Sequence, residues 1–318
     1  MRTGWYVFMI KVSHMSKYYG EYPAVLDISF TVKEGETVGL LGPNGAGKST
    51  TMKVLTGFTP PTSGEVSIGG FDITKNSFDV RKMIGYLPES VPLYSDMSVI
   101  EYLQFMAKIR GMKEGIVKRV NEVIEITGLE EYRKVLIGKL SKGYRQRTGI
   151  AQSIVHKPKV LILDEPTIGI DPVQVVETRS LIQSLGGEHT LILSSHILPE
   201  VSTICKRVLV IHDGKIVADD SPEILSKRLR STQVCEISVT KTAKLDVIKL
   251  FRSQSYVVDI RTKADSNPSY NSFIIETSST DSVEEKISKL IIENGLGLSK
   301  LVSLPLSLEE IFLQLTTD

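Results

Sequence analysis

Eight residues in the first fifty have the types and spacing of a phosphate-binding loop. The run from Gly42 to Ser49 reads GPNGAGKS and fits the pattern G-x-x-x-x-G-K-[ST]. Glycines let backbone N–H groups curve around a phosphate, and a helix predicted from Ser49 directs its positive end at the same anion. The pattern predicts that Lys48 reaches the β- and γ-phosphates of a nucleotide and that the Ser49 hydroxyl coordinates Mg²⁺.

Two carboxylates follow a strongly apolar run further along the chain. The residues from Val160 to Leu163 precede Asp164 and Glu165. Four apolar residues in a row suit a strand covered on both faces, and ligands of open α/β sheets bind at the carboxyl ends of the strands. We expect Asp164 to hold Mg²⁺, directly or through water, and Glu165 to act as a general base toward water. A solvated acidic turn is the alternative interpretation.

The segments around these motifs alternate between strand and helix patterns. An apolar strand over residues 36–41 leads into the phosphate loop, and a helix over residues 49–56 follows it. Ser98 and Glu101 have the spacing of a helix capping box, and residues 97–156 are predicted to be mostly helical. This order predicts an α/β fold with a helical block inside it. Further strand patterns lie at residues 160–163, 190–194 and 208–211.

The pattern changes from residue 231 onward. Cys235, Ile237 and Val239 alternate with polar residues, as in a half-buried strand. The following patterns complete the order β-α-β-β-α-β, which is the split βαβ, ferredoxin-like arrangement. We therefore expect two domains, residues 1–230 and residues 231–318. The second would be an α+β accessory domain, and its position favours a role in dimerisation or regulation.

The composition excludes several classes of protein. The chain has 318 residues, of which 41% are hydrophobic and 24% charged, so global disorder is disfavoured. A net charge of +1 disfavours a strongly basic nucleic-acid binder. Two cysteines, Cys205 and Cys235, cannot form a disulfide framework and favour a reducing compartment. The sequence has no apolar run of about 18 residues, so it predicts no transmembrane helix.

A third motif indicates a family. The run from Leu140 to Arg147, LSKGYRQR, resembles the signature motif of ATP-binding-cassette (ABC) ATPases. The resemblance covers about residues 9–225 and includes the other motifs of that family in order. Four single residues match these motifs: Tyr19 the aromatic that stacks on adenine, Glu89 the Q-loop position, Asp171 the D-loop and His196 the switch histidine.

The resemblance implies a P-loop NTPase fold, with a RecA-like sheet core and a helical subdomain at about residues 97–156, that hydrolyses ATP with Mg²⁺. Lys48, Glu165 and His196 would be catalytic, with Glu165 as the base and His196 orienting the γ-phosphate. The implied metal ligands are Ser49, Glu89 and Asp164. The implied nucleotide contacts are Tyr19, Gly42, Asn44, Gly45, Gly47, Lys48, Ser49, Thr50, Ser141, Gly143 and Asp171.

The resemblance also implies partners. In this family the signature motif and the phosphate loop of one chain cannot face the same nucleotide. A head-to-tail homodimer, or a paired cassette, would therefore hold two ATP molecules between its subunits. Ser141 and Gly143 of one chain would face the γ-phosphate held by Lys48 of the other. Hydrolysis would drive a separate membrane permease, which places the chain in the cytoplasm, peripheral on the inner face of the cell membrane.

Three residues depart from the family pattern. Lys142 stands where a glycine usually follows the signature serine, Tyr144 stands where a glutamine is usual, and Glu89 replaces the Q-loop glutamine. These variants resemble the exporter-type subunits that pair with ABC-2-type permeases, including those of drug, lipid or polysaccharide export and of gliding motility. The run from Ser307 to Phe312 resembles the end of the C-terminal extension of that subfamily.

Three other functions stay open. A soluble ABC ATPase that acts on nucleic acid or ribosomes is disfavoured by the single cassette, by the near-neutral charge and by the missing zinc-ligand cysteine pairs. A regulatory cassette with weak hydrolysis would rest on Lys142 and Tyr144. An importer is less favoured because of the C-terminal run. The sequence does not identify the transported substrate, because that specificity lies in the permease.

Overall fold

The chain divides into two compact units. The computed structural model describes residues 8–229, 233–240, 246–263, 270–278 and 283–304. By its internal contacts the chain separates into Met1–Pro222 and Glu223–Asp318, here called the N-terminal and C-terminal units. The sequence placed this boundary after residue 230, and the units divide a few residues earlier, at the start of helix α8 (Pro222–Leu229). The run from Ser307 to Phe312, which resembles the end of a subfamily's C-terminal extension, lies outside the described residues.

The N-terminal unit is built on a six-stranded sheet. In spatial order its strands are β10 (Lys215–Asp220), β9 (Arg207–His212), β3 (Thr37–Leu41), β8 (Thr190–Ser195), β7 (Val160–Asp164) and β6 (Ile84–Leu87). Neighbouring strands from β9 to β6 pair in parallel, whereas β10 runs antiparallel to β9. Every residue of β7 and β8 is buried, because helices and a second sheet cover the two faces. The α/β core expected from the sequence is confirmed.

The register of the central strands brings three motifs to one edge of this sheet. Leu41 of β3 lies opposite Ser195 of β8, and Asp164 of β7 lies opposite Ser194 of β8. The phosphate loop follows β3, Glu165 follows β7, and the histidine expected at the switch position follows β8. Because the three strands are parallel, all three motifs begin at the same edge.

A second sheet of the N-terminal unit is antiparallel and contributes to the same core. Its order is β2 (Tyr22–Lys33), β1 (Phe8–Tyr19), β4 (Ser63–Ile68) and β5 (Phe71–Asp72). Residues of this sheet, of helix α1 (Lys48–Leu55) and of β3 and β7 form one buried apolar cluster. The turn between β1 and β2 sets Tyr19 opposite Tyr22, and Gly20 supplies the positive φ that this turn needs.

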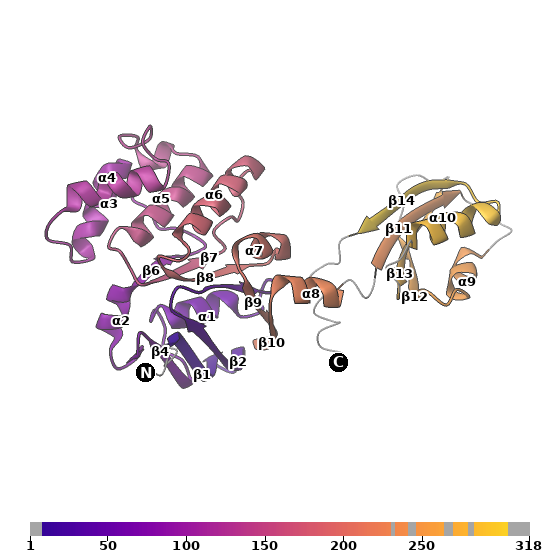
Figure 1. Cartoon of the computed structure of the whole chain (residues 1–318), viewed down its shortest axis with the longest axis horizontal. Helices are drawn as coiled ribbons and strands as arrows, with labels where there is room; N and C mark the ends of the chain where they lie inside the picture. Colours follow the sequence, from indigo (N-terminus) through magenta and orange to yellow (C-terminus); the bar gives the residue numbers. More distant parts are fainter. Residues whose placement is uncertain (1–7, 230–232, 241–245, 264–269, 279–282, 305–318) are drawn as a thin grey trace, which may run out of the picture. The chain divides into compact units, whose positions relative to one another are not determined.

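Three helices occupy the segment that was expected to be helical, and they lie together in Figure 1. They are α3 (Val99–Ile109), α4 (Ile116–Ile126) and α5 (Lys142–Ile154). The predicted capping box is confirmed, since Ser98 and Glu101 exchange side-chain and backbone hydrogen bonds at the start of α3. Three more helices of this unit are α2 (Ser77–Met83), α6 (Pro172–Leu185) and α7 (Leu198–Ile204).

The C-terminal unit has the predicted element order β-α-β-β-α-β. Its elements are β11 (Gln233–Thr240), α9 (Val247–Arg252), β12 (Val257–Lys263), β13 (Tyr270–Thr277), α10 (Val283–Glu293) and β14 (Leu298–Leu304). The sheet order is β12-β13-β11-β14, and every pair is antiparallel. Cys235, Phe251, Ile275 and Ile287 belong to its apolar core. The ferredoxin-like assignment stays a prediction, as does a role in dimerisation or regulation.

Close packing of β6 against α5 allows a stability prediction. A Cβ on Gly85 would clash with the carbonyl oxygen of Ser153 and lie 2.9 Å from Cγ of Pro158. Backbone cannot move aside as a flexible side-chain end can, so we expect Gly85→Ala to lower the free energy of unfolding by about 3 kcal/mol. Chemical denaturation followed by circular dichroism measures this loss.

Gly70→Ala is the matched control for this substitution. Gly70 has a φ of +83°, but a Cβ there meets no atom within 4 Å. Its substitution should therefore cost about 1 kcal/mol, from backbone strain alone. Equal losses of stability in the two variants would contradict the crowding described at Gly85.

Candidate active site

The phosphate loop runs from the end of β3 into α1 and is shaped by its glycines. Gly47, at the N-cap of α1, has a φ of 107°, and a Cβ there would lie 2.6 Å from the carbonyl oxygen of Ala24. A Cβ on Gly42 would clash with the carbonyl oxygen of Ile211. Gly45 also has a positive φ, and the space around it is open. Glycine at these positions keeps the loop backbone free to approach a phosphate.

Lys48 is buried at the centre of the site. Its Nζ donates hydrogen bonds to the carbonyl oxygens of Gly42, at 2.8 Å, and Pro43, at 3.1 Å. It also lies 3.2 Å from Oε1 of Glu165, and both side chains are only 6% exposed. The predicted lysine and the predicted general base are therefore in direct contact, although they lie far apart in the sequence.

Asp164 receives two hydroxyl hydrogen bonds. Oγ of Ser49 donates to its Oδ1 at 3.2 Å, and Oγ of Ser194 donates to the same oxygen at 2.6 Å. Burial raises the pKa of Asp164, these two hydrogen bonds oppose the rise, and the charges of Glu165 and Glu89 add to it. The two ligands expected for Mg²⁺ from the loop and the strand thus face each other.

Ser194 was not singled out in the sequence. Besides donating to Asp164, its Oγ accepts a hydrogen bond from the backbone N–H of Glu165 at 2.9 Å. One buried hydroxyl therefore fixes both consecutive carboxylates to the neighbouring strand. The sequence did contain a signal for this role, because Ser194 lies at the end of the apolar run of β8, just before Ser195 and His196.

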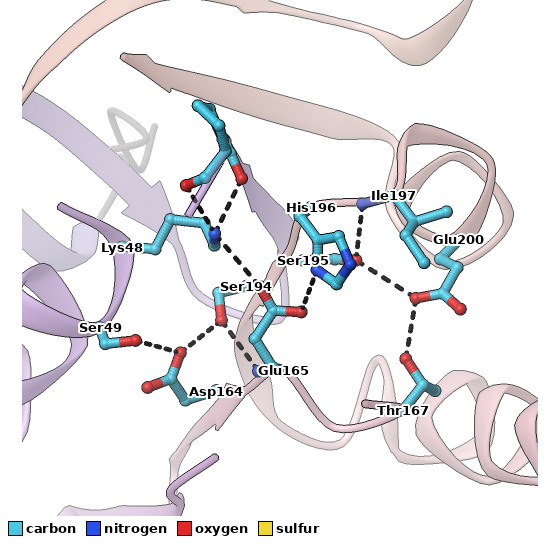
Figure 2. Close-up of polar contacts among 12 residues, drawn as sticks. Lys48, Ser49, Asp164, Glu165, Thr167, Ser194, Ser195, His196, Ile197 and Glu200 are labelled. Atoms are coloured by element: carbon cyan, nitrogen blue, oxygen red, sulfur yellow. Dashed lines mark hydrogen bonds and ion pairs between the residues drawn. The ribbon is translucent and has the colours of Figure 1, made fainter. Parts of the chain in front are cut away.

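Glu165 connects Lys48 to His196. Nδ1 of His196 lies 3.0 Å from Oε2 of Glu165, while Oε1 of Glu165 faces Lys48, as Figure 2 shows. Glu165 has a φ of 48°, a left-handed conformation that is strained for a side chain with a Cβ. A carboxylate held between a cation and an imidazole at the mouth of a phosphate loop can accept a proton from water beside a bound phosphate.

A cavity of about 430 Å³ opens beside the phosphate loop. The half-exposed ring of Tyr19 lies at this cavity, with Nζ of Lys17 5.2 Å from the ring centre. Tyr22 also lines the cavity and was not anticipated from the sequence. The cavity has the size of a small-molecule site. Its lining residues are Tyr19, Tyr22, Ala24, Asn44, Gly45, Gly47, Lys48, Ser49, Thr50, Glu89, Glu165 and Ile168.

The oxygen donors of this site fit Mg²⁺. The cation is held in nucleotide sites by one or two protein oxygens together with phosphates and waters, rather than by a closed protein cage. Ser49 and Asp164 supply such oxygens within hydrogen-bond distance of each other, and Glu89 lines the cavity. In the described part of the chain, no cluster of three or more histidine, cysteine or acidic side chains forms a separate metal cage.

The signature residues and Asp171 are not among the residues that line this cavity. Ser141 caps α5 and accepts a hydrogen bond from the backbone N–H of Tyr144 at 3.3 Å. Gly143 has no room for a Cβ, because Gln174 of α6 fills that space. Asp171 caps α6 by accepting from the backbone N–H of Gln174 at 3.0 Å. Contacts with Gln174 bring these three residues together away from the cavity.

Two of the departures from the family pattern have contacts within the chain. The ring of Tyr144 stacks on Tyr132 with a centroid distance of 3.9 Å, and Arg147 lies 5.6 Å from the Tyr144 ring centre. The ammonium group of Lys142 fills the space that a Cβ on Gly169 would need. Tyr144 therefore packs within the helical block, and Lys142 reaches the loop that leads to Asp171.

Comparison with known proteins shows the family of the chain. Residues 25–168 match the model of the family described as ABC transporter. The bacitracin transport ATP-binding protein BcrA of Bacillus licheniformis is 36% identical over 309 residues, which is 96% of this chain and 97% of that protein. The linearmycin resistance ATP-binding protein LnrL of Bacillus subtilis is 36% identical and covers 79% of this chain and 81% of its own length.

Solved structures share the fold of the N-terminal unit. An ATP-binding subunit of an ABC transporter is 28% identical with a TM-score of 0.63, covering 70% of this chain and 93% of its own. A bacterial ABC transporter cassette solved as a dimer is 26% identical with a TM-score of 0.62, covering 67% and 99%. Among the described residues, no helix has the length and apolar character to cross a membrane. The chain belongs to the ABC transporter family, as an ATP-binding subunit that hydrolyses ATP.

Proposed function

We propose that the chain powers an exporter by hydrolysing ATP at the contact of Lys48, Glu165 and His196. The single observation that carries this proposal is the chain of contacts in which the buried Glu165 joins the phosphate-loop lysine at 3.2 Å to the histidine at 3.0 Å. Glu165 would take the proton of the water that attacks the γ-phosphorus. His196 would orient the γ-phosphate, and Lys48 would offset its charge.

The neighbouring residues would bind the nucleotide and its metal ion. Backbone N–H groups of the phosphate loop would hold the phosphates, while Tyr19 would stack on the adenine ring. Ser49, Asp164 and Glu89 would hold Mg²⁺, which supplies charge compensation on the phosphate oxygens when bound. The hydroxyls of Ser49 and Ser194 already orient Asp164 toward the loop, so little reorganisation is needed there.

We further propose a head-to-tail dimer. Ser141, Gly143 and Asp171 lie apart from the cavity that the phosphate loop lines, so one protomer does not complete the expected nucleotide contacts. A second copy, placed about a twofold axis, would present these residues to the phosphates held by Lys48. The dimeric solved cassette, at 26% identity, supports this arrangement.

The membrane partner is proposed to be an ABC-2-type permease that exports its substrate. Relatives named as bacitracin transport proteins match nearly the whole chain in two bacteria, Bacillus licheniformis and Enterococcus faecalis, at 36% and 32% identity. These matches include the C-terminal unit, which supports an exporter over a soluble ATPase that acts on nucleic acid. The chain would then sit at the inner face of the cell membrane through its permease.

Removal of the proposed base tests this mechanism. Glu165→Gln keeps the size of the side chain but cannot accept the proton, so we expect turnover to fall by about 10²- to 10⁴-fold while ATP still binds. In the presence of ATP this variant should then accumulate as a stable dimer, because the bound ATP is not hydrolysed. Lys48→Ala should lose ATP affinity and dimerisation. The measurements are phosphate release and size-exclusion chromatography with light scattering, on the purified full chain.

The control for the charge change is Glu188→Gln, an exposed carboxylate that should leave both measurements as in the wild type. A wild-type chain that binds ATP but neither dimerises nor hydrolyses it would instead favour a regulatory cassette, or one that needs its membrane partner. Lys142 and Tyr144 would then be the first residues to substitute, in order to test whether they prevent hydrolysis.

The proposed metal ligands give a second test. Asp164→Asn removes the negative charge that faces Ser49, so the Mg²⁺ concentration for half-maximal nucleotide binding should rise about 10-fold or more. Calorimetric titration of ATP at stepwise Mg²⁺ concentrations measures the change, with Glu188→Gln as the comparison. An unchanged Mg²⁺ requirement in Asp164→Asn would remove Asp164 from the metal site.

A further inference from the structure

A buried carboxylate outside the cavity links two loops of the active site. Glu200, in α7, is 6% exposed. Its Oε2 accepts hydrogen bonds from Oγ1 of Thr167, at 2.8 Å, and from Oγ of Ser195, at 3.2 Å. Its Oε1 accepts from Nη2 of Arg179, at 2.9 Å. A buried charge is tolerated when it is paired and hydrogen-bonded in this way.

The two hydroxyls stand next to the proposed catalytic pair. Thr167 follows Glu165 by two residues, and Ser195 immediately precedes His196. Oγ of Ser195 also accepts from the backbone N–H of Ile197 at 3.0 Å, which closes the turn around the histidine. Figure 2 shows Glu200 on the far side of the Glu165–His196 contact, bonded to both loops.

We propose that Glu200 is a positioning residue for ATP hydrolysis, which holds the loop after β7 and the loop after β8 so that Glu165 and His196 stay in contact. The inference rests on the roles proposed above for these two residues. Glu200 is not among the residues that line the nucleotide cavity, so it acts through them. Because the same oxygen, Oε2 of Glu200, accepts a hydrogen bond from each loop, it sets the distance between the two loops directly.

The strained backbone of Glu165 shows why the hydrogen bonds of Glu200 would matter for catalysis as well as for stability. Glu165 is held with a φ of 48°, a conformation that persists only when its surroundings enforce it. Ser194 fixes the N–H side of that residue at 2.9 Å. The bond from Thr167 to Glu200 fixes the chain just beyond it. Together the two bonds restrain the turn from both sides and so set the direction of the Glu165 carboxylate.

Glu200→Met tests the proposal, because methionine has a similar length and no oxygen to accept the two hydroxyls. In the purified full chain we expect kcat to fall about 10- to 100-fold, since displacement of a reacting group by about 1 Å has effects of that size. The dissociation constant for ATP should change less than about twofold, because the contacts of Lys48 are untouched. A wild-type kcat in this variant would overturn the proposal.

Two further variants separate positioning from stability. Glu200→Met leaves the Arg179 guanidinium unpaired, so its melting temperature should fall. The double variant Arg179→Met/Glu200→Met removes both charges of this ion pair and should regain melting temperature while kcat stays low. Recovery of kcat together with melting temperature would show a role in stability alone and overturn the proposal. Thr167→Val, which keeps the ion pair, should lower kcat about 3- to 10-fold and cost less stability than Glu200→Met.

Three reference variants complete the experiment. Thr203→Ala, on the exposed face of the same helix, should keep the wild-type kcat. Glu165→Gln and His196→Ala should lose turnover. If both of these keep wild-type turnover, the proposed function fails. If they lose it while Glu200→Met and Thr167→Val do not, the positioning role of Glu200 alone is wrong. Thr167→Val decides the matter if Glu200→Met does not fold.

Discussion

The buried ion pair between Lys48 and Glu165 is the interaction on which the rest of the site depends. Both side chains are 6% exposed, so neither charge is compensated by water. Removal of one member of such a pair commonly costs about 3–5 kcal/mol, because the other charge stays buried without a partner. Two loop carbonyl oxygens complete the environment of the lysine, and His196 completes that of the carboxylate. These contacts require β3, β7 and β8 to keep the register in which their carboxyl ends coincide.

Sequence reasoning identified the groups that local patterns determine. Glycine is needed at Gly42 and Gly47 because a Cβ at either position would clash with a backbone carbonyl oxygen. The apolar run before Asp164 is the buried strand β7. The capping box at Ser98 is equally local. Ser194, Tyr22 and Glu200 escaped notice because their importance arises from pairing between distant strands and loops. No pattern within a window of a few residues carries that information.

The departures from the family pattern have physical consequences that the sequence did not specify. Tyr144 stands where a glutamine is usual in the signature motif, and its ring stacks on that of Tyr132. Lys142 lies against Gly169, which allows the approach because it has no Cβ. Glu89 adds a third carboxylate to the surroundings of Asp164 and Glu165, and its charge contributes to the raised pKa of Asp164. Three neighbouring carboxylates repel one another, so a divalent cation bound among them would be stabilised by their negative charge.

Two single oxygen atoms in this site each form two hydrogen bonds to neighbouring segments. Oγ of Ser194 bonds to Asp164 and to the backbone of Glu165, and Oε2 of Glu200 bonds to the hydroxyls of Thr167 and Ser195. Ser194 ties the end of β7 to β8, whereas Oε2 of Glu200 joins the loop after β7 to the loop after β8. The same coupling offers a direct route by which a change after β7 would reach the histidine after β8.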